Sequence, residues 1–261
     1  MLVFVVPLKS RRLAKSWDRV ARLCERTLKS ICGQNSPAFK AIVVCHEKPD
    51  IEFQHPAVSY VNVDFPLPVF DDQSGLNRDQ HRKIAAGFIA AGEFRPSHVM
   101  AVDADDCISN KLAEWIERNA KSPGWFFESG YIYRDGSRRI YRKQEDFYHW
   151  CGTSNIVRYD LLQLPDRAEI ARLDVRSFRH LVVKEKLAEE GAALAPLPFP
   201  GAVYVQTKRG EATHTRGVIA WTLRRRSPRV LHYAKQSILD LLCSEPLTPA
   251  IEAEFGLYPL E

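Results

Sequence analysis

Short, uninterrupted apolar runs recur in the first half of this chain, and a segment with helical periodicity separates the first two. These runs lie at residues 2–6 and within the strand expected at residues 40–45, and both are rich in β-branched side chains, which is typical of strands buried on both faces. Between them, from Trp17 to Ile31, apolar residues recur at spacings of three and four, which predicts an amphipathic helix that ends near Gly33. This alternation predicts an α/β fold with a mostly parallel sheet flanked by helices.

The rest of the chain continues the pattern with one interruption. Strands are expected at residues 58–63 and 97–106, with a helix between them at residues 78–91. Asp135 and Gly136 lie between two apolar runs and predict a β-hairpin, where the regular alternation breaks. The remaining expected elements are a polar turn that enters a strand at residues 150–157, a helix at residues 178–190, a last strand at residues 202–206 and a helix at residues 230–243.

The composition is that of an ordinary soluble chain. It has 261 residues, 45% of them hydrophobic, and its 37 Lys and Arg against 32 Asp and Glu give a net charge of 37 − 32 = +5. Disorder, collagen and coiled coil are excluded. The length suggests one large domain or two small ones, and no break in composition marks a linker. The small excess of positive charge does not indicate nucleic-acid binding.

The cysteines and the start of the sequence predict a cytoplasmic protein. The apolar run at residues 2–6 is too short for a signal-peptide core or a membrane span. Six Cys residues, none of them in a CxxC pair, are expected to be reduced and mostly buried thiols. The arginines at 224–226 are interpreted as a solvated helix face, with contact to an anionic membrane surface as the alternative.

The strand expected at residues 97–106 runs directly into three carboxylates. If the strand continues through them, Asp103 and Asp105 share one face while Asp106 points away or begins the turn. Two oxygen donors of this kind suit Mg²⁺ or Mn²⁺. Open α/β sheets bind ligands beyond the carboxyl ends of their strands, which is where this cluster falls. The alternative is a solvated acidic turn.

The order of these motifs resembles that of the family 2 nucleotide-sugar glycosyltransferases, which have the GT-A fold. The matching features are Pro7-Leu8 after the first strand, the helix with residues 26–31, the strand at 41–45, the helix at 78–92 with Lys83 and Gly87, and Gly92-Glu93-Phe94 leading into residues 99–106. The resemblance implies a Rossmann-like nucleotide-diphospho-sugar transferase fold in a single domain. Residues 1–110 would form its nucleotide-sugar-binding half, and residues 111–261 its acceptor-side half with C-terminal helices.

This resemblance implies a hexosyltransferase-like enzyme. It would transfer a sugar from a nucleotide-diphosphate sugar, with UDP as the favoured nucleotide, to a hydroxyl of a glycan or lipid-linked acceptor. The transfer would invert the configuration at the anomeric carbon and would need Mn²⁺ or Mg²⁺. By position, Asp103 would contact the nucleotide sugar and Asp105 would bind the metal, with both tasks open to sharing. Lys83 would reach the phosphates or the base, and Pro7 and Leu8 would lie beside the nucleobase. Alternatively, Lys83 is a solvated helix lysine, and Pro7 and Leu8 are plain strand-end residues.

The sequence departs from the family at two places. After the second strand, Cys45-His46-Glu47-Lys48 replaces an acidic stretch that holds the nucleobase, and Glu47 or His46 would substitute. The acid expected as general base is missing from the position of Arg179-His180. His180 could take that role because its reference pKa lies near neutrality, and Asp174 is the rival.

Residues 150–155 would be the acceptor-side segment of the family. Later in the chain, His214 would complete the metal shell, and Arg216 would pair with the diphosphate, since guanidinium recognises phosphate oxygens. Two other classes remain open. One is a nucleotidyltransferase or another Mg²⁺-dependent phosphate-handling enzyme, and the other is a catalytically inactive nucleotide-sugar-binding module.

Overall fold

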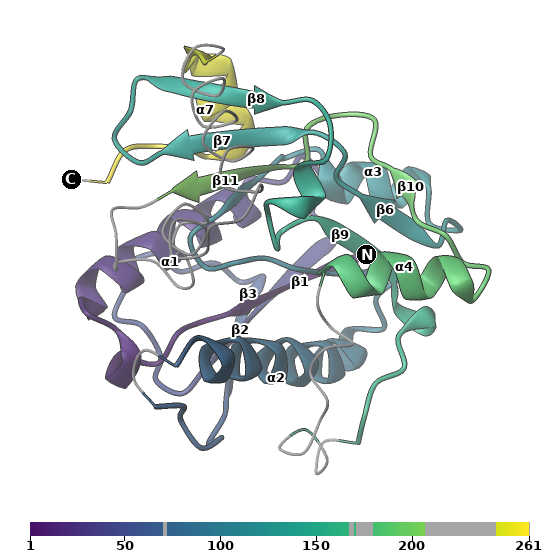
Figure 1. The fold of residues 1–261 in the computed structure, drawn as a ribbon, viewed down its shortest axis with the longest axis horizontal. Coiled ribbons are helices and arrows are strands. Elements are labelled where there is room, and N and C mark those ends of the chain that lie inside the picture. Colours follow the sequence, from purple (N-terminus) through teal and green to yellow (C-terminus); the bar gives the residue numbers. More distant parts are fainter. Residues whose placement is uncertain (70–71, 167–169, 171–179, 207–243, 261) are drawn as a thin grey trace, which may run out of the picture.

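The structure is a computed structural model that describes residues 1–69, 72–166, 170, 180–206 and 244–260 (Figure 1). A central seven-stranded sheet has the order β10-β6-β9-β4-β1-β2-β3. Its strands are β1 (Leu2–Pro7), β2 (Phe39–Cys45), β3 (Val58–Asn62), β4 (His98–Ala101), β6 (Gly124–Phe126), β9 (Asn155–Arg158) and β10 (Ala195–Pro196). β1 pairs in parallel with both β2 and β4, and β2 with β3, whereas β9 is antiparallel to β4 and β6. The predicted α/β fold with a mostly parallel sheet is confirmed.

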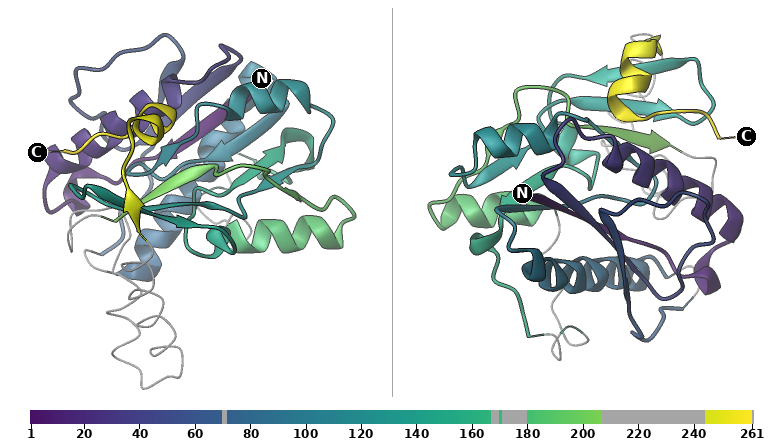
Figure 2. Two further views of the ribbon diagram at one scale, coloured as in Figure 1. Left: turned by 90° about the horizontal axis from the view of Figure 1, so that it is seen from above. Right: turned by 180° about the vertical axis from the view of Figure 1, so that it is seen from behind.

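Helices cover both faces of this sheet (Figures 1 and 2). The described helices are α1 (Trp17–Cys32), α2 (Gln73–Ala91), α3 (Leu112–Arg118), α4 (His180–Glu189) and α7 (Pro249–Phe255). Single 3₁₀ turns lie at Arg11–Leu13, Gly92–Phe94, Phe147–His149 and Tyr159–Leu161.

The uninterrupted apolar character of β1 follows from its position between two helices. Its even-numbered residues pack with α1, as Phe4 does in one buried cluster with Leu28. Its odd-numbered residues pack with α2, as Val5 does with Ile84. Successive side chains of a strand point to opposite faces, so both sets must be apolar.

Capping residues and one glycine place these two helices. The Ser16 side chain accepts a hydrogen bond from the Arg19 N–H at the start of α1, and Gly33 follows its last turn, as predicted. Asp72 caps α2 in the same way, so this helix begins at Gln73 and not at residue 78. α2 approaches β1 closely at Gly87, where a Cβ atom would lie 2.2 Å from Val5 Cγ1.

A second sheet was not predicted. It has the order β12-β8-β7-β11-β5, and its strands are β5 (Cys107–Ile108), β7 (Gly130–Arg134), β8 (Arg139–Lys143), β11 (Ala202–Gln206) and β12 (Glu245–Pro246). β7 and β8 form the hairpin expected at Asp135 and Gly136, and Gly136 has the positive φ of 80° that such a turn requires. β11 lies between β7 and β5 and is followed by β12, so it is not the last strand.

A buried ion pair connects α1 to this second sheet. The Arg26 guanidinium is fully buried and donates to Asp135 Oδ1 (2.7 Å) and to the Tyr258 carbonyl (3.0 Å). Arg19 also pairs with Asp135. Three chain segments that are far apart in sequence therefore meet at the Arg26 guanidinium.

Three further expectations concern the thiols, the possibility of a membrane span and the C-terminal helix. Cys24, Cys32, Cys45, Cys107 and Cys151 are free thiols, as expected. Among the described helices, none combines the length and the apolar character that crossing a bilayer requires. The helix expected at residues 230–243 and the arginines at 224–226 lie outside the described residues.

Candidate functional site

Asp103, Asp105 and Asp106 form a turn, called here the carboxylate turn, at the carboxyl end of β4. The strand ends at Ala101, so the prediction of a strand through residue 106 is wrong. The Val102 N–H still bonds to the Val5 carbonyl, after which the chain turns and the Asp106 N–H donates to the Asp103 carbonyl (3.1 Å). The orientation of the carboxylates therefore depends on the turn and not on strand alternation.

Asp106 points into the protein and holds the turn in place. Its carboxylate is buried and accepts hydrogen bonds from Thr153 Oγ1 (2.7 Å), the Val205 N–H (3.0 Å) and Cys151 Sγ (3.2 Å). Burial, followed by the charges of Asp105 and Asp103, raises its pKa well above the ordinary value. Asp106 thus links the turn to residues 151–153 and to β11.

Asp103 is the carboxylate that opens to a pocket. Its Oδ1 accepts a hydrogen bond from Gln80 Nε2 on α2 (2.6 Å), and its N–H donates to Thr153 Oγ1 (2.9 Å). A Cβ atom at Gly152 would lie 2.9 Å from its Oδ2, so the glycine leaves room for this side chain. Burial and, next, the charge of Asp105 raise the pKa of Asp103 to about 7. Asp103 and Asp105 therefore oppose each other's ionisation.

The raised pKa of Asp103 predicts a pH dependence of stability. The folded chain binds more protons than the unfolded chain between the ordinary value of 3.8 and about 7. The contribution of Asp103 to the free energy of unfolding is therefore full below this window and is lost as the pH rises through it. Asp103→Asn should remove this loss. In urea unfolding, the free energy of unfolding of the variant should therefore rise relative to that of the wild type as the pH increases through this window. A stability difference that stays constant with pH would contradict the raised pKa.

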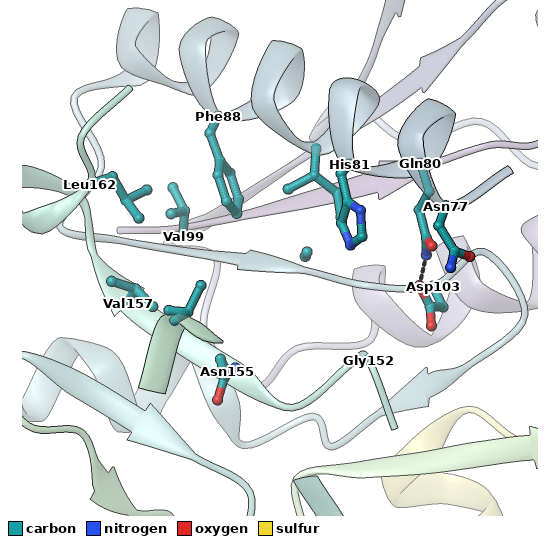
Figure 3. A pocket seen from close by; sticks show the side chains of 13 residues that line it. Asn77, Gln80, His81, Phe88, Val99, Asp103, Gly152, Asn155, Val157 and Leu162 are labelled. Carbon is teal, nitrogen blue, oxygen red and sulfur yellow. Dashed lines mark hydrogen bonds between the residues drawn. The ribbon is translucent and has the colours of Figure 1, made fainter. Parts of the chain in front are cut away.

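A cavity of about 230 Å³ lies between α2 and the strands β4 and β9 (Figure 3). Asp103 and Gly152 stand at one end, and Asn155 of the expected acceptor-side segment forms part of the wall. Such a cavity, apolar with a few converging polar groups and a carboxyl of raised pKa, has the properties of a ligand site. The complete lining is Asn77, Gln80, His81, Ile84, Phe88, Val99, Ala101, Asp103, Gly152, Asn155, Val157, Leu162 and Val183.

The structure corrects the expectation for Lys83. This side chain is 1% exposed, and its Nζ donates to Asp79 Oδ2 (2.7 Å) and to the Leu8 carbonyl (2.8 Å). Burial lowers its pKa, while Asp79 opposes that effect. Lys83 is neither a solvated lysine nor directed at an open ligand site, because its hydrogen bonds fix α2 against the end of β1.

Pro7 and Leu8 fit the alternative of plain strand-end residues. Both are buried, with Leu8 fully inside the core cluster under α1. Their side chains therefore do not form an open surface for a nucleobase. Glu47 is half-buried and accepts hydrogen bonds from Ser10 Oγ and the Arg11 N–H, both at 3.1 Å. It holds the loop that follows β1.

Of the remaining candidate residues, only His180 falls on a described element. It is the first residue of α4. Asp174, His214 and Arg216 lie outside the described residues. Within the described ranges no cluster of three or more His, Cys, Asp or Glu side chains could hold a metal. Asp103 and Asp105 remain as a pair of oxygen donors, which suits a cation that completes its shell with water and phosphate.

Gln80 is a site residue that the sequence interpretation missed, and the contacts of Thr153, which lies in the expected acceptor-side segment, were missed as well. Asn77, Gln80 and His81 are spaced by three and four along α2 and all line the cavity. This polar stripe on a helix that is otherwise packed on a sheet was the available signal. Thr153 had no such signal, because its contacts to Asp103 and Asp106 join positions about fifty residues apart.

The fold and the site define an α/β protein in which a cavity reaches a carboxylate turn at the carboxyl edge of a mostly parallel sheet. No known family profile matches the sequence, and no curated protein matches it. Solved structures resemble it only at low identity and with TM-scores below 0.5.

Three of these solved structures illustrate the likeness. TarS from S. aureus is 12% identical with a TM-score of 0.43, over 78% of this chain and 60% of that chain. The 2-C-methyl-D-erythritol 4-phosphate cytidylyltransferase of Francisella tularensis is 12% identical with a TM-score of 0.40, over 85% and 98%. A candidate nucleotide-diphospho-sugar transferase from Desulfovibrio desulfuricans is 8% identical with a TM-score of 0.36, over 92% and 97%. At these identities and TM-scores the likenesses define neither a family nor an activity.

Proposed function

We propose that this protein is a glycosyltransferase of the family 2 type that transfers a sugar from a nucleotide-diphosphate sugar to an acceptor hydroxyl. The observation that carries the proposal is the carboxylate turn, which places Asp103 and Asp105 directly after β4 at the carboxyl edge of the parallel sheet. Two carboxylates in one turn at this edge are suited to bind a divalent cation.

Within this proposal each residue has a defined task. Asp103 and Asp105 would hold Mn²⁺ or Mg²⁺, which supplies charge neutralisation for the diphosphate leaving group. Gln80 orients the Asp103 carboxylate through its hydrogen bond, and Asp106 keeps the turn in place through Thr153. His180 at the start of α4, or Asp174, would take the proton of the acceptor hydroxyl, and His214 and Arg216 would contact the metal and the diphosphate.

A nucleotidyltransferase is the second candidate. The observation that favours it is a basic loop directly after β1, in which Arg11 and Arg12 are exposed. Exposed guanidinium groups beside the carboxyl end of a strand are suited to the phosphates of a nucleoside triphosphate. The two reactions differ in their products, since sugar transfer releases a nucleoside diphosphate and nucleotidyl transfer releases diphosphate.

The proposal is tested by titrating UDP, GDP and CMP with and without Mn²⁺ while the melting temperature is recorded. We expect UDP with Mn²⁺ to raise Tm, and at about 100 times Kd the gain is about 2.7 kcal/mol, or roughly 5–10 °C for a chain of this size. UDP without Mn²⁺ should have a much smaller effect. A Tm that no nucleoside diphosphate raises in a metal-dependent way would overturn the proposal, and release of diphosphate from CTP or UTP would favour the second candidate.

A further inference from the structure

The cavity has two chemically different ends (Figure 3). One end is polar and consists of side chains from α2 together with Asp103 of the carboxylate turn. The other end is apolar and lies between α2 and the strands, where Phe88, Val99, Val157 and Leu162 face the space. A ligand that fills the cavity must therefore have an apolar body and one polar end.

The lining also restricts the charge of the ligand. The described residues that line the cavity include Asp103 and no Lys or Arg. In the proposed function the donor diphosphate takes up the charge of the metal at the carboxylate turn, so an anionic acceptor group would find no cationic side chain among the described lining residues. A hydroxyl, by contrast, can donate to the Gln80 amide oxygen. The polar end of the ligand is therefore a neutral hydrogen-bond donor.

The size of the cavity indicates a ring. Apolar cavities of about 150 Å³ in proteins take up benzene. The present cavity of about 230 Å³ has room for one such ring together with a short polar substituent. Ala101 of β4 and Val183 of α4 also line it, so a strand and a helix both contribute to its walls.

We propose that this cavity binds the acceptor, and that the acceptor is an uncharged hydroxyl compound with an apolar, ring-sized body. The inference rests on the proposed function, because it places the donor diphosphate at the carboxylate turn and hence the donor sugar beside the polar end. In the transfer, the acceptor oxygen forms a bond to the anomeric carbon, and the bond from that carbon to the diphosphate oxygen breaks. The hydroxyl proton passes to the general base, and the nucleoside diphosphate leaves with the bonding electrons.

Three probe molecules test the chemistry of the cavity by saturation-transfer NMR in the presence of UDP and Mn²⁺. 2-Phenylethanol has the ring and the hydroxyl, phenylacetate replaces the hydroxyl by a negative charge, and butane-1,4-diol lacks the ring. We expect a saturation-transfer signal from 2-phenylethanol. The signals from phenylacetate and butane-1,4-diol should be weaker by about fivefold or more, because the first lacks the hydroxyl and the second lacks the ring. Equal signals from 2-phenylethanol and butane-1,4-diol, or from 2-phenylethanol and phenylacetate, would overturn the inference.

Two filling variants and one matched control locate the binding. Ala101→Leu places a larger side chain in the cavity from β4. Val183→Phe fills the cavity from α4 and is used if the first variant does not fold. Ala188→Leu makes the same kind of change on the exposed side of α4, outside the cavity. We expect the 2-phenylethanol signal to be lost in the filling variants and kept in Ala188→Leu.

The response to UDP separates this inference from the function on which it rests. The stabilisation by UDP and Mn²⁺ should persist in a filling variant that has lost 2-phenylethanol binding. Loss of the UDP response in that variant would mean that the cavity belongs to the nucleotide and would overturn the inference. An undiminished 2-phenylethanol signal in a folded filling variant would also overturn it. Absence of a UDP response in the wild type instead overturns the proposed function, whatever the probes do.

Discussion

Replacement of Lys83 by Met is expected to lower the free energy of unfolding by about 3–5 kcal/mol. Lys83 and Asp79 form a pair that is 1% and 7% exposed, and the lysine also donates to the Leu8 carbonyl. Methionine of similar length leaves the Asp79 carboxylate buried without its cation and the carbonyl without its donor. The loss is measured by urea unfolding monitored by circular dichroism.

Two variants control this experiment. Arg118→Met removes the cation of another i,i+4 pair, with Glu114, whose side chains are 72% and 39% exposed, and should cost less than about 1 kcal/mol. The double change Lys83→Met with Asp79→Leu removes both charges and should recover a large part of the loss, because apolar replacements of buried ion pairs are tolerated. A Lys83→Met loss no greater than that of Arg118→Met would show that the pair is solvated in solution.

The second large effect is expected at the carboxylate turn. Asp103→Asn and Asp105→Asn should each weaken the Mn²⁺-dependent binding of UDP by at least about 100-fold, because each removes a charged oxygen ligand of the metal. Loss of a residue that only supports a metal ligand already lowers metal affinity by about 10–100-fold. Asparagine keeps the size of the side chain, and at position 103 its carbonyl can still accept the hydrogen bond from Gln80. Isothermal titration with UDP at fixed Mn²⁺ measures the affinity.

Asp64→Asn is the matched control for these variants. Asp64 is an exposed carboxylate that follows β3 at the same edge of the sheet, so its replacement changes the net charge equally. It should leave UDP binding unchanged. Binding that survives in Asp105→Asn would remove Asp105 from the metal site, and an equal loss in Asp64→Asn would attribute the effect to overall charge.

The central sheet and its helices were largely predictable because their signals are local. Residues 2–6 and 41–45 are apolar on both faces, and this pattern is typical of strands that are covered by helices on both sides. The hairpin at Asp135 and Gly136 was equally local, since its turn needs a positive φ that glycine readily adopts.

The second sheet and the division of residues 125–133 were not predictable in this way. Trp125 belongs to β6 in the central sheet, and Tyr131 to β7 in the second sheet, although the two residues are only six positions apart. β5 pairs with β11, which lies almost a hundred residues later. Such pairings depend on which strand edges remain unpaired after the core has formed. The local sequence pattern of a strand does not indicate which edges these are.

For the site, the sequence by itself determined which carboxylates gather at the carboxyl edge of the sheet, because a strand must deliver them there. Only the tertiary structure decided their tasks. Asp106 turns inward to Thr153 and β11, Asp103 faces the cavity with Gln80, and Lys83 is buried with Asp79. The physical reason is that charge and hydrogen-bonding capacity are properties of a residue, whereas desolvation and partners come from distant segments that pack around it.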